Sequence, residues 1–158
     1  MKSFYVICLL VLVGWTTPVL AQSGANASNM EIVKEKLMAD KKLLVATNMD
    51  LTDAEAKAFW PLYDDYQSEL DKINNRLGRT IGDYAEAFNK GALQNDTAKR
   101  LMSEVLAVEE SETHLKRATA DKLRKVLPAS KAARYIQMET KIRAIIKADL
   151  AQQIPLVY

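Results

Sequence analysis

The fold is decided at residues 51–63, which read LTDAEAKAFWPLY and open a long helix. Thr52 is a good helix cap, and Glu55 follows three residues later. This spacing predicts a capping box, in which each side chain accepts a hydrogen bond from the backbone amide of the other residue. Farther along, apolar residues recur mostly at alternating steps of four and three: Phe59, Tyr63, Tyr66, Leu70, Ile73, Leu77, Ile81, Tyr84 and Phe88. Such a seam predicts a helix to about Asn89 that packs along a partner.

One proline and two glycines lie within this predicted helix, and a third glycine follows it. Pro61 removes one backbone hydrogen bond and is expected to kink the helix near its start. Gly78 and Gly82 share one face, where they allow either a bend or a close crossing with another helix. Gly91 is suited to the left-handed conformation that often follows a helix.

Two helices are predicted on either side of the long one. The first covers Met30–Thr47, where apolar residues return at helical spacing. The later one begins at Asn95 or Asp96 and runs to about Val126, with an apolar set of Ala98, Leu101, Met102, Val105, Val108, Leu115, Leu123 and Val126. Glu112 and Thr119 interrupt that set. We therefore expect the middle of this helix to be accessible to solvent.

A fourth helix is predicted to begin with Pro128, because proline suits the first helical position. Its apolar residues are Ala132, Tyr135, Ile136, Ile142, Ile145, Ile146 and Leu150, and Pro155 ends its last turn. The chain has 158 residues, of which 5 are Gly and 4 are Pro, and this composition favours helix. We predict an all-α protein of four helices, two of them long, in antiparallel, hairpin-like packing.

The N-terminus has the layout of a secretory signal peptide. Lys2 precedes an apolar run over Phe4–Trp15, and small or apolar residues occupy the −3 and −1 positions of a cut after Ala21. The run is too short to cross about 30 Å of hydrocarbon as a helix. We therefore expect residues 1–21 to be a cleaved signal peptide, residues 22–29 a disordered leader and residues 30–158 one helical domain. After cleavage we expect no stable membrane insertion.

Net charge and cysteine content give no support for nucleic-acid binding or thiol chemistry. The net charge of the whole chain is +2, which gives no argument for binding nucleic acid. Cys8 is the one cysteine and lies within residues 1–21, so the exported chain would have neither disulfides nor thiol chemistry.

Catalytic and metal-binding patterns are equally scarce. His114 is the one histidine, and Glu110 lies four residues before it on the same helical face. These two residues are candidates for a metal site shared across a dimer. The alternative is a solvated acidic face with a surface histidine, since zinc and di-iron sites need more histidine or cysteine ligands. We expect no cofactor and no enzymatic activity.

The densest aromatic cluster comprises Phe59, Trp60, Tyr63 and Tyr66. Three of these residues lie on the apolar seam, where core packing is the default. Trp60 lies about 100° away from Phe59 around the helix, toward the flank of that seam. The four residues are therefore candidates for protein binding as well as for the core, because aromatic residues often anchor interfaces.

The stretch Leu51-Thr52-Asp53-Ala54-Glu55 has a fainter echo in Leu127-Pro128-Ala129-Ser130-Lys131. In both, a leucine precedes a helix start, and a signal peptide and two long helices complete the pattern. This arrangement resembles the Spy/CpxP family of periplasmic proteins, whose signature is two LTxxQ motifs. The first motif matches with Glu in place of Gln, and the second matches only in its leucine and its position.

The resemblance implies an all-helical, cradle-shaped homodimer in the periplasm. Family members act as ATP-independent chaperones or as envelope-stress and metal-stress accessories. We therefore expect a binding protein for unfolded or partner proteins. The alternatives are a metal-responsive periplasmic protein and a closed structural bundle that docks one protein partner.

Overall fold

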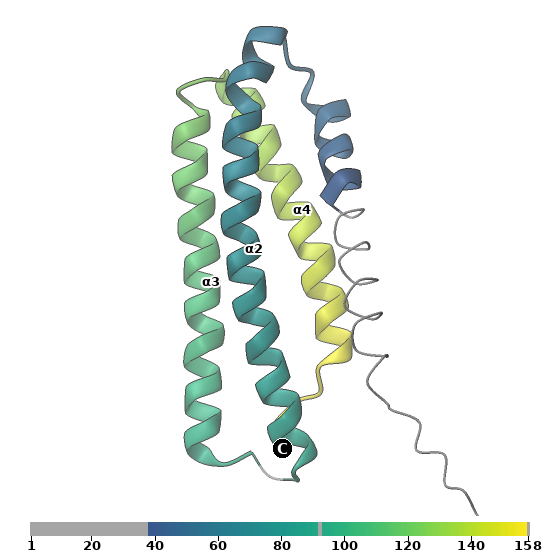
Figure 1. The fold of residues 1–158 in the computed structure, drawn as a ribbon, viewed down its shortest axis with the longest axis vertical. Coiled ribbons are helices and arrows are strands. Elements are labelled where there is room, and N and C mark those ends of the chain that lie inside the picture. Colours follow the sequence, from purple (N-terminus) through teal and green to yellow (C-terminus); the bar gives the residue numbers. More distant parts are fainter. Residues whose placement is uncertain (1–37, 92, 158) are drawn as a thin grey trace, which may run out of the picture. The chain divides into compact units, whose positions relative to one another are not determined.

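The computed structural model describes residues 38–91 and 93–157 (Figure 1). This part of the chain is all-helical, as predicted, and contains no strand. Its helices are a first segment at 38–49, then α2 (Asp53–Asn89), α3 (Asn95–Leu123) and α4 (Ala129–Gln153). The expected signal peptide, leader and first turns of the first helix lie outside the described residues.

Internal contacts divide the chain after Lys42, within the first helix. Leu43–Tyr158 forms one compact unit, and every contact discussed below lies inside it. Residues 38–42 are the described part of the other unit, and they continue the same helix.

The start of α2 confirms the predicted capping box. The Thr52 backbone N–H donates to Glu55 Oε2 at 2.8 Å, and the Glu55 N–H donates to Thr52 Oγ1 at 3.3 Å. Lys131, in the first turn of α4, donates to the same carboxylate at 2.7 Å and to the Asp50 carbonyl at 2.5 Å. The Lys131 hydrogen bond is the main cause that lowers the pKa of Glu55. Lys131 thus links the start of α4 to the start of α2.

The structure also shows where Pro61 and the three glycines lie in and after α2. The helix continues without interruption through Pro61. Gly91 adopts a φ of +89°, so the predicted left-handed residue after the helix is confirmed. A Cβ atom added to Gly78 or Gly82 would meet no atom of the described chain within 4 Å. These two glycines therefore do not mark a close crossing with another described helix.

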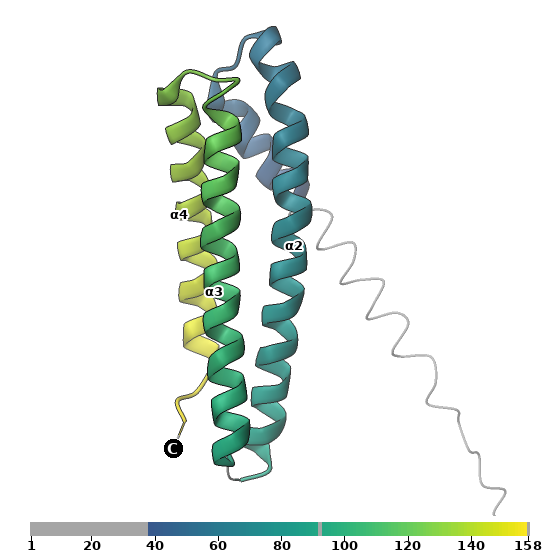
Figure 2. The same cartoon turned by 90° about the vertical axis from the view of Figure 1, so that its left-hand side faces the viewer.

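The helices α2 and α3 form an antiparallel hairpin, and α4 runs back beside α3 (Figures 1 and 2). Two ion pairs join the hairpin, Arg76–Glu104 and Arg100–Asp83, each with an N–O distance of 2.8 Å. The helix α3 begins at Asn95, as predicted, and its N-cap residue Gln94 makes no side-chain capping hydrogen bond.

The two later helix boundaries differ slightly from the prediction. The helix α3 ends at Leu123, and turns follow to Leu127, so Val126 lies outside the helix. Pro128 is the N-cap of α4 rather than its first helical residue. The difference at Pro128 is one residue, and its cause is the extended ψ of 143° that Pro128 adopts before the helix.

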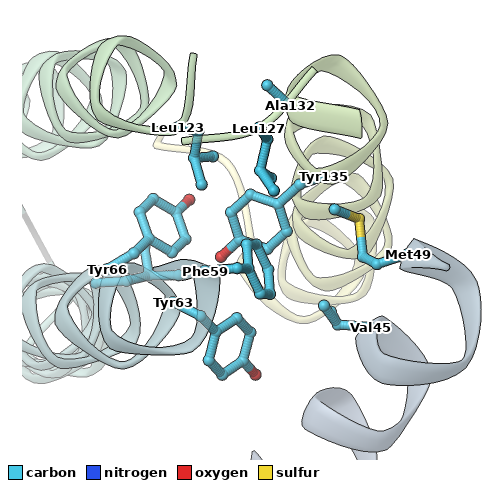
Figure 3. Packing of buried hydrophobic residues seen from close by; sticks show 10 residues of the cluster. Val45, Met49, Phe59, Tyr63, Tyr66, Leu123, Leu127, Ala132 and Tyr135 are labelled. Atoms are coloured by element: carbon cyan, nitrogen blue, oxygen red, sulfur yellow. The ribbon is translucent and has the colours of Figure 1, made fainter. Parts of the chain in front are cut away.

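One end of the bundle holds a dense core, called the aromatic core below (Figure 3). It draws residues from all four helices and from the turn before α4: Val45, Met49, Phe59, Tyr63, Tyr66, Leu70, Leu123, Leu127, Ala132 and Tyr135. The Tyr135 ring contacts those of Phe59, Tyr63 and Tyr66 with centroids 5.2 to 6.0 Å apart. Leu127 is buried in this core and Leu51 packs against it, so both leucines of the sequence echo contact the aromatic core.

The two polar residues that interrupt the seam of α3 are buried, so the prediction that they make its middle accessible to solvent is wrong. Glu112 and Thr119 are 4% and 5% exposed. The buried line of α4 also differs from the predicted apolar set, since it contains Glu139 and Arg143 while Ile145 faces solvent. Opposite charges on facing helices neutralise each other, so Glu112 and Arg143 can both interrupt an apolar seam and stay buried.

None of the described helices is long and apolar enough to cross a membrane.

Candidate functional site

Polar side chains cross the bundle interior next to the aromatic core. Gln67 Nε2 donates to Glu139 Oε1 at 2.9 Å and to the Tyr135 hydroxyl at 3.3 Å. One helical turn farther on, Arg143 donates from Nε to Glu112 Oε1 at 3.0 Å and from Nη1 to Asn74 Oδ1 at 2.8 Å. We call Gln67, Asn74, Glu112, Glu139 and Arg143 the polar layer. It connects α2, α3 and α4 by side-chain hydrogen bonds.

The ion pair at the centre of this layer is deeply buried. Glu112 and Arg143 are 4% and 8% exposed, and Lys147 Nζ lies 3.3 Å from the second carboxylate oxygen of Glu112. Burial acts to raise the pKa of Glu112, but the hydrogen bond from Arg143 and the charges of Arg143 and Lys147 outweigh it and lower the pKa. Glu112 therefore stays ionised in the folded protein at neutral pH.

Beyond the polar layer the interior opens into an apolar cavity of about 720 Å³, which we call the end groove. It lies among the last turns of α2, the first half of α3 and the second half of α4. Its walls comprise Leu77, Thr80, Ile81, Tyr84, Leu93, Ala98, Leu101, Met102, Val105, Leu106, Val108, Glu109, Glu112, Arg143, Lys147, Leu150, Ala151 and residues 154–157. Glu112 and Arg143 of the polar layer are thus part of its wall.

The difference between the two ends follows from the side chains that point inward. At the aromatic core, rings and the side chains of Val45 and Met49 fill the space among α2, α3 and α4. At the other end the inward residues are mostly aliphatic, such as Leu77, Ile81 and Leu101. No Cα atom of α2 comes within 8 Å of one in α4, two helices that are described throughout. Shorter side chains across that separation leave volume unfilled.

The end groove has an exposed apolar rim on α3. Met102 and Leu106 are 61% and 53% exposed, and Val105 between them is also exposed. Single exposed apolar side chains are ordinary on protein surfaces, whereas several around an apolar cavity mark an interaction site. Methionine suits such a rim because its unbranched side chain adapts to different contacts.

Charged groups of both signs border the same rim. Lys147 Nζ lies 3.9 Å from Glu109 Oε1, and both side chains are about half exposed. With the buried pair, the four charges near the end groove sum to zero. The site therefore selects for apolar character rather than for one sign of charge.

The residues that follow α4 form the remaining wall. Ile154–Val157 follow α4 and line the end groove, and we call these four residues the C-terminal strap. The Tyr84 hydroxyl, near the end of α2, donates to the Pro155 carbonyl at 2.8 Å. This hydrogen bond brings the strap back to the end of the bundle where α2 meets α3, as Figures 1 and 2 show.

The predicted protein-binding aromatics lie at the opposite end. Phe59, Tyr63 and Tyr66 are buried in the aromatic core and do not form an exposed surface. Trp60 is partly buried and packs against that core, with its ring 5.0 Å from the ring of Phe59 and 5.3 Å from that of Tyr63. Their placement agrees with the default of core packing.

The metal candidates stand apart from any cluster of ligands. His114 and Glu110 are both exposed on α3. Within the described residues, no group of three or more His, Cys, Asp or Glu side chains is placed to hold a metal ion.

Reasoning from the sequence did not identify the end groove. Its one signal was the content of each seam: aromatic residues dominate the first half of α2, and aliphatic residues dominate the second half. Comparison with known proteins adds no relative, because no protein-family model, no curated protein and no solved structure matches the chain.

Proposed function

We propose that this protein is an exported, periplasmic binding protein without catalytic chemistry, which holds apolar segments of unfolded or partner proteins. This role corresponds to a Spy/CpxP-like ATP-independent chaperone or envelope-stress accessory. The observation that carries the proposal is the end groove, an apolar cavity of about 720 Å³ with an exposed apolar rim. A closed structural bundle would bury such residues against one another.

The proposed mechanism is reversible burial of apolar side chains. A leucine-sized side chain contributes about 1.5–3 kcal/mol when it leaves water completely. Two or three such side chains therefore contribute about 3–9 kcal/mol, against an association cost of about 4–15 kcal/mol. The balance favours weak binding of each segment, so release needs no source of energy. A protein that holds unfolded chains without ATP requires this property.

The groove walls also bear on what can bind. They are helices, whose backbone groups are already hydrogen-bonded within each helix, and their lining side chains are mostly apolar. An extended segment inserted between them would lose backbone hydrogen bonds to water without replacement. Side chains of a client therefore enter the groove while its backbone stays at the rim. Lys147 and Glu109 at that rim favour clients that carry charges beside their apolar residues.

Suppression of aggregation tests this proposal. A denatured client that aggregates on dilution is mixed with the purified protein at equimolar ratio, and light scattering is followed. We expect the wild-type protein to reduce scattering. Leu106→Asp places a charge on the groove rim, so it should weaken this effect. Absence of suppression by the wild-type protein at that ratio overturns the proposal.

The matched control is Leu43→Asp. Leu43 is 64% exposed, similar to Leu106, but it lies on the first helix and does not line the end groove. Loss of suppression in Leu106→Asp alone supports the groove as the binding site. Equal loss in both variants means that general surface hydrophobicity, rather than the end groove, holds the client.

The family resemblance also implies a homodimer, which we include in the proposal. Sedimentation velocity of the purified protein tests it directly. A single species with twice the monomer mass supports the dimer, and a monomer at micromolar concentration contradicts it.

A further inference from the structure

The C-terminal strap exposes apolar side chains at the mouth of the end groove. It contains Leu156 and Val157, which are 80% and 59% exposed although both line the end groove. Apolar side chains at the mouth of an apolar cavity gain free energy when an occupant covers them. An occupant of the end groove can therefore cover apolar surface that the strap exposes to solvent.

Among the described residues, two hydrogen bonds attach the strap. The helical hydrogen bonds of α4 finish with the Ile154 N–H, which donates to the Leu150 carbonyl at 3.1 Å. Pro155 comes next and has no backbone N–H, so the helix cannot continue through it. The hydrogen bond from Tyr84 to the Pro155 carbonyl then joins the strap to α2. One neutral hydrogen bond of this kind contributes about 0.5–1.5 kcal/mol, so the strap can open and close readily.

The strap leaves the end groove open in the present structure. The cavity of about 720 Å³ has the strap as one of its walls. The strap therefore borders the cavity without filling it, and an apolar side chain can enter without removing Leu156 or Val157. A terminus that blocked the site would occupy this volume instead.

We propose that the C-terminal strap is a clamp that closes over an apolar group in the end groove and slows its release. This inference rests on the proposed function, because it concerns the same groove. The Tyr84 hydrogen bond positions the strap at the mouth, and Leu156 and Val157 supply the surface that covers the occupant. Because these contacts form after entry, the strap acts mainly on the rate of dissociation.

Release kinetics test the clamp. The apolar dye 1-anilinonaphthalene-8-sulfonate is bound to the purified protein, and its dissociation is followed by stopped-flow fluorescence after dilution. Tyr84→Phe keeps the ring and removes the donor to Pro155, so release should be about 2- to 10-fold faster. The double variant L156S/V157S should also release the dye faster, with little change in the association rate.

Two controls keep the result specific. Leu43→Ser removes an exposed leucine outside the end groove and should leave the release rate unchanged. Circular dichroism and Trp60 fluorescence report whether each variant keeps its helices and its aromatic core. Trp60 packs against that core, at the end opposite the strap.

The outcomes separate the two proposals. Faster release in both strap variants supports the clamp. Binding by the wild-type protein with unchanged release in the variants overturns the clamp and leaves the groove function standing. Tighter binding in the variants also overturns it, because the strap would then compete with the occupant. A wild-type protein that binds neither dye nor client overturns the proposed function and the clamp with it.

Discussion

Replacement of Arg143 by methionine tests how the polar layer holds the three long helices together. Methionine keeps much of the side-chain length but removes the charge and the hydrogen bonds to Glu112 at 3.0 Å and to Asn74 at 2.8 Å. The Glu112 carboxylate, 4% exposed, would remain buried without its main partner. Removal of one member of a buried ion pair typically costs about 3–5 kcal/mol.

Lys147 moderates this cost. Its Nζ lies 3.3 Å from Glu112 Oε2, so one cation stays near the orphaned carboxylate. We therefore expect Arg143→Met to lower the free energy of unfolding by about 3 kcal/mol, near the lower end of that range. This is a large part of the roughly 5–15 kcal/mol that stabilises a typical domain. Urea unfolding followed by circular dichroism measures the loss.

A second variant removes both charges of the buried pair. In Glu112→Leu combined with Arg143→Met, no buried charge is left without a partner. Arg143 Nη2 has no hydrogen-bond partner among the described residues, so the double replacement also removes an unsatisfied buried donor. We expect the double variant to lie within about 1 kcal/mol of the wild-type protein.

An exposed pair provides the comparison. Lys72 and Glu69 are 2.5 Å apart on the surface of α2, and Lys72→Ala should change the stability by less than about 1 kcal/mol. A loss below about 1 kcal/mol in Arg143→Met would refute the reasoning, because a buried pair would then behave as an exposed one. A double variant no more stable than the single variant would refute it equally.

Four further results are expected. The folded-state pKa of Glu112 is lowered, so its ionisation stabilises the fold above the unfolded-state pKa, and this contribution is lost as the pH falls through the folded-state pKa. When unfolding is measured at a series of acid pH values, the stability advantage of the wild-type protein over Glu112→Gln should therefore shrink. An advantage independent of pH would contradict the ion pair. Thr52→Ala removes one side of the capping box and should cost about 0.5–2 kcal/mol in urea unfolding, whereas an unchanged midpoint would mean that the cap contributes nothing. Burial raises the pKa of Tyr135, so its phenol should ionise only as the protein unfolds at high pH; in an ultraviolet titration, Tyr135→Phe should remove part of the late, cooperative step, and loss of a step near pH 10 instead would show that the ring is accessible. The exported protein should begin at Gln22, which mass spectrometry of the purified chain determines, and an intact N-terminus would contradict the signal peptide.

Local chemistry made the start of α2 predictable from sequence. The capping box needs only Thr52, Glu55 and the three-residue spacing between them, and the structure shows both hydrogen bonds. The left-handed Gly91 is local in the same sense, because only its own φ angle matters. Features set by neighbours along the chain were therefore predicted to within a residue or two.

The polar layer could not be predicted in this way. Considered alone, Glu112 interrupts an apolar seam, and exposure is the ordinary expectation for a glutamate. Its burial depends on Arg143, 31 residues later on another helix, and on Asn74 behind it. A single sequence gives the spacing of charges on each helix but not which charges face each other. Helical spacing places Arg143 on the line of Ala132, Tyr135 and Glu139, but which residue of α3 faces it depends on how α4 packs against α3.

The end groove depends on still longer-range geometry. Its volume results from the separation of α2 and α4 and from aliphatic side chains that do not bridge it. The aromatic residues suggested a binding surface, because they are the usual anchors of interfaces. In the folded chain the same rings fill the other end of the bundle. The exposed rim includes Met102, which the sequence suggested only as part of a seam, and Leu106, which lay outside the predicted seam.

Site-specific cross-linking tests most directly whether the end groove holds protein segments. A photoreactive amino acid is placed at position 106 on the groove rim or, as the control, at position 43 on the first helix, and a denatured client is added before illumination. Leu106 and Leu43 are both exposed, but only Leu106 lines the end groove. We predict cross-links to the client from position 106 and few from position 43. Equal yields from both positions, or none from position 106 while the client is bound, would contradict the account.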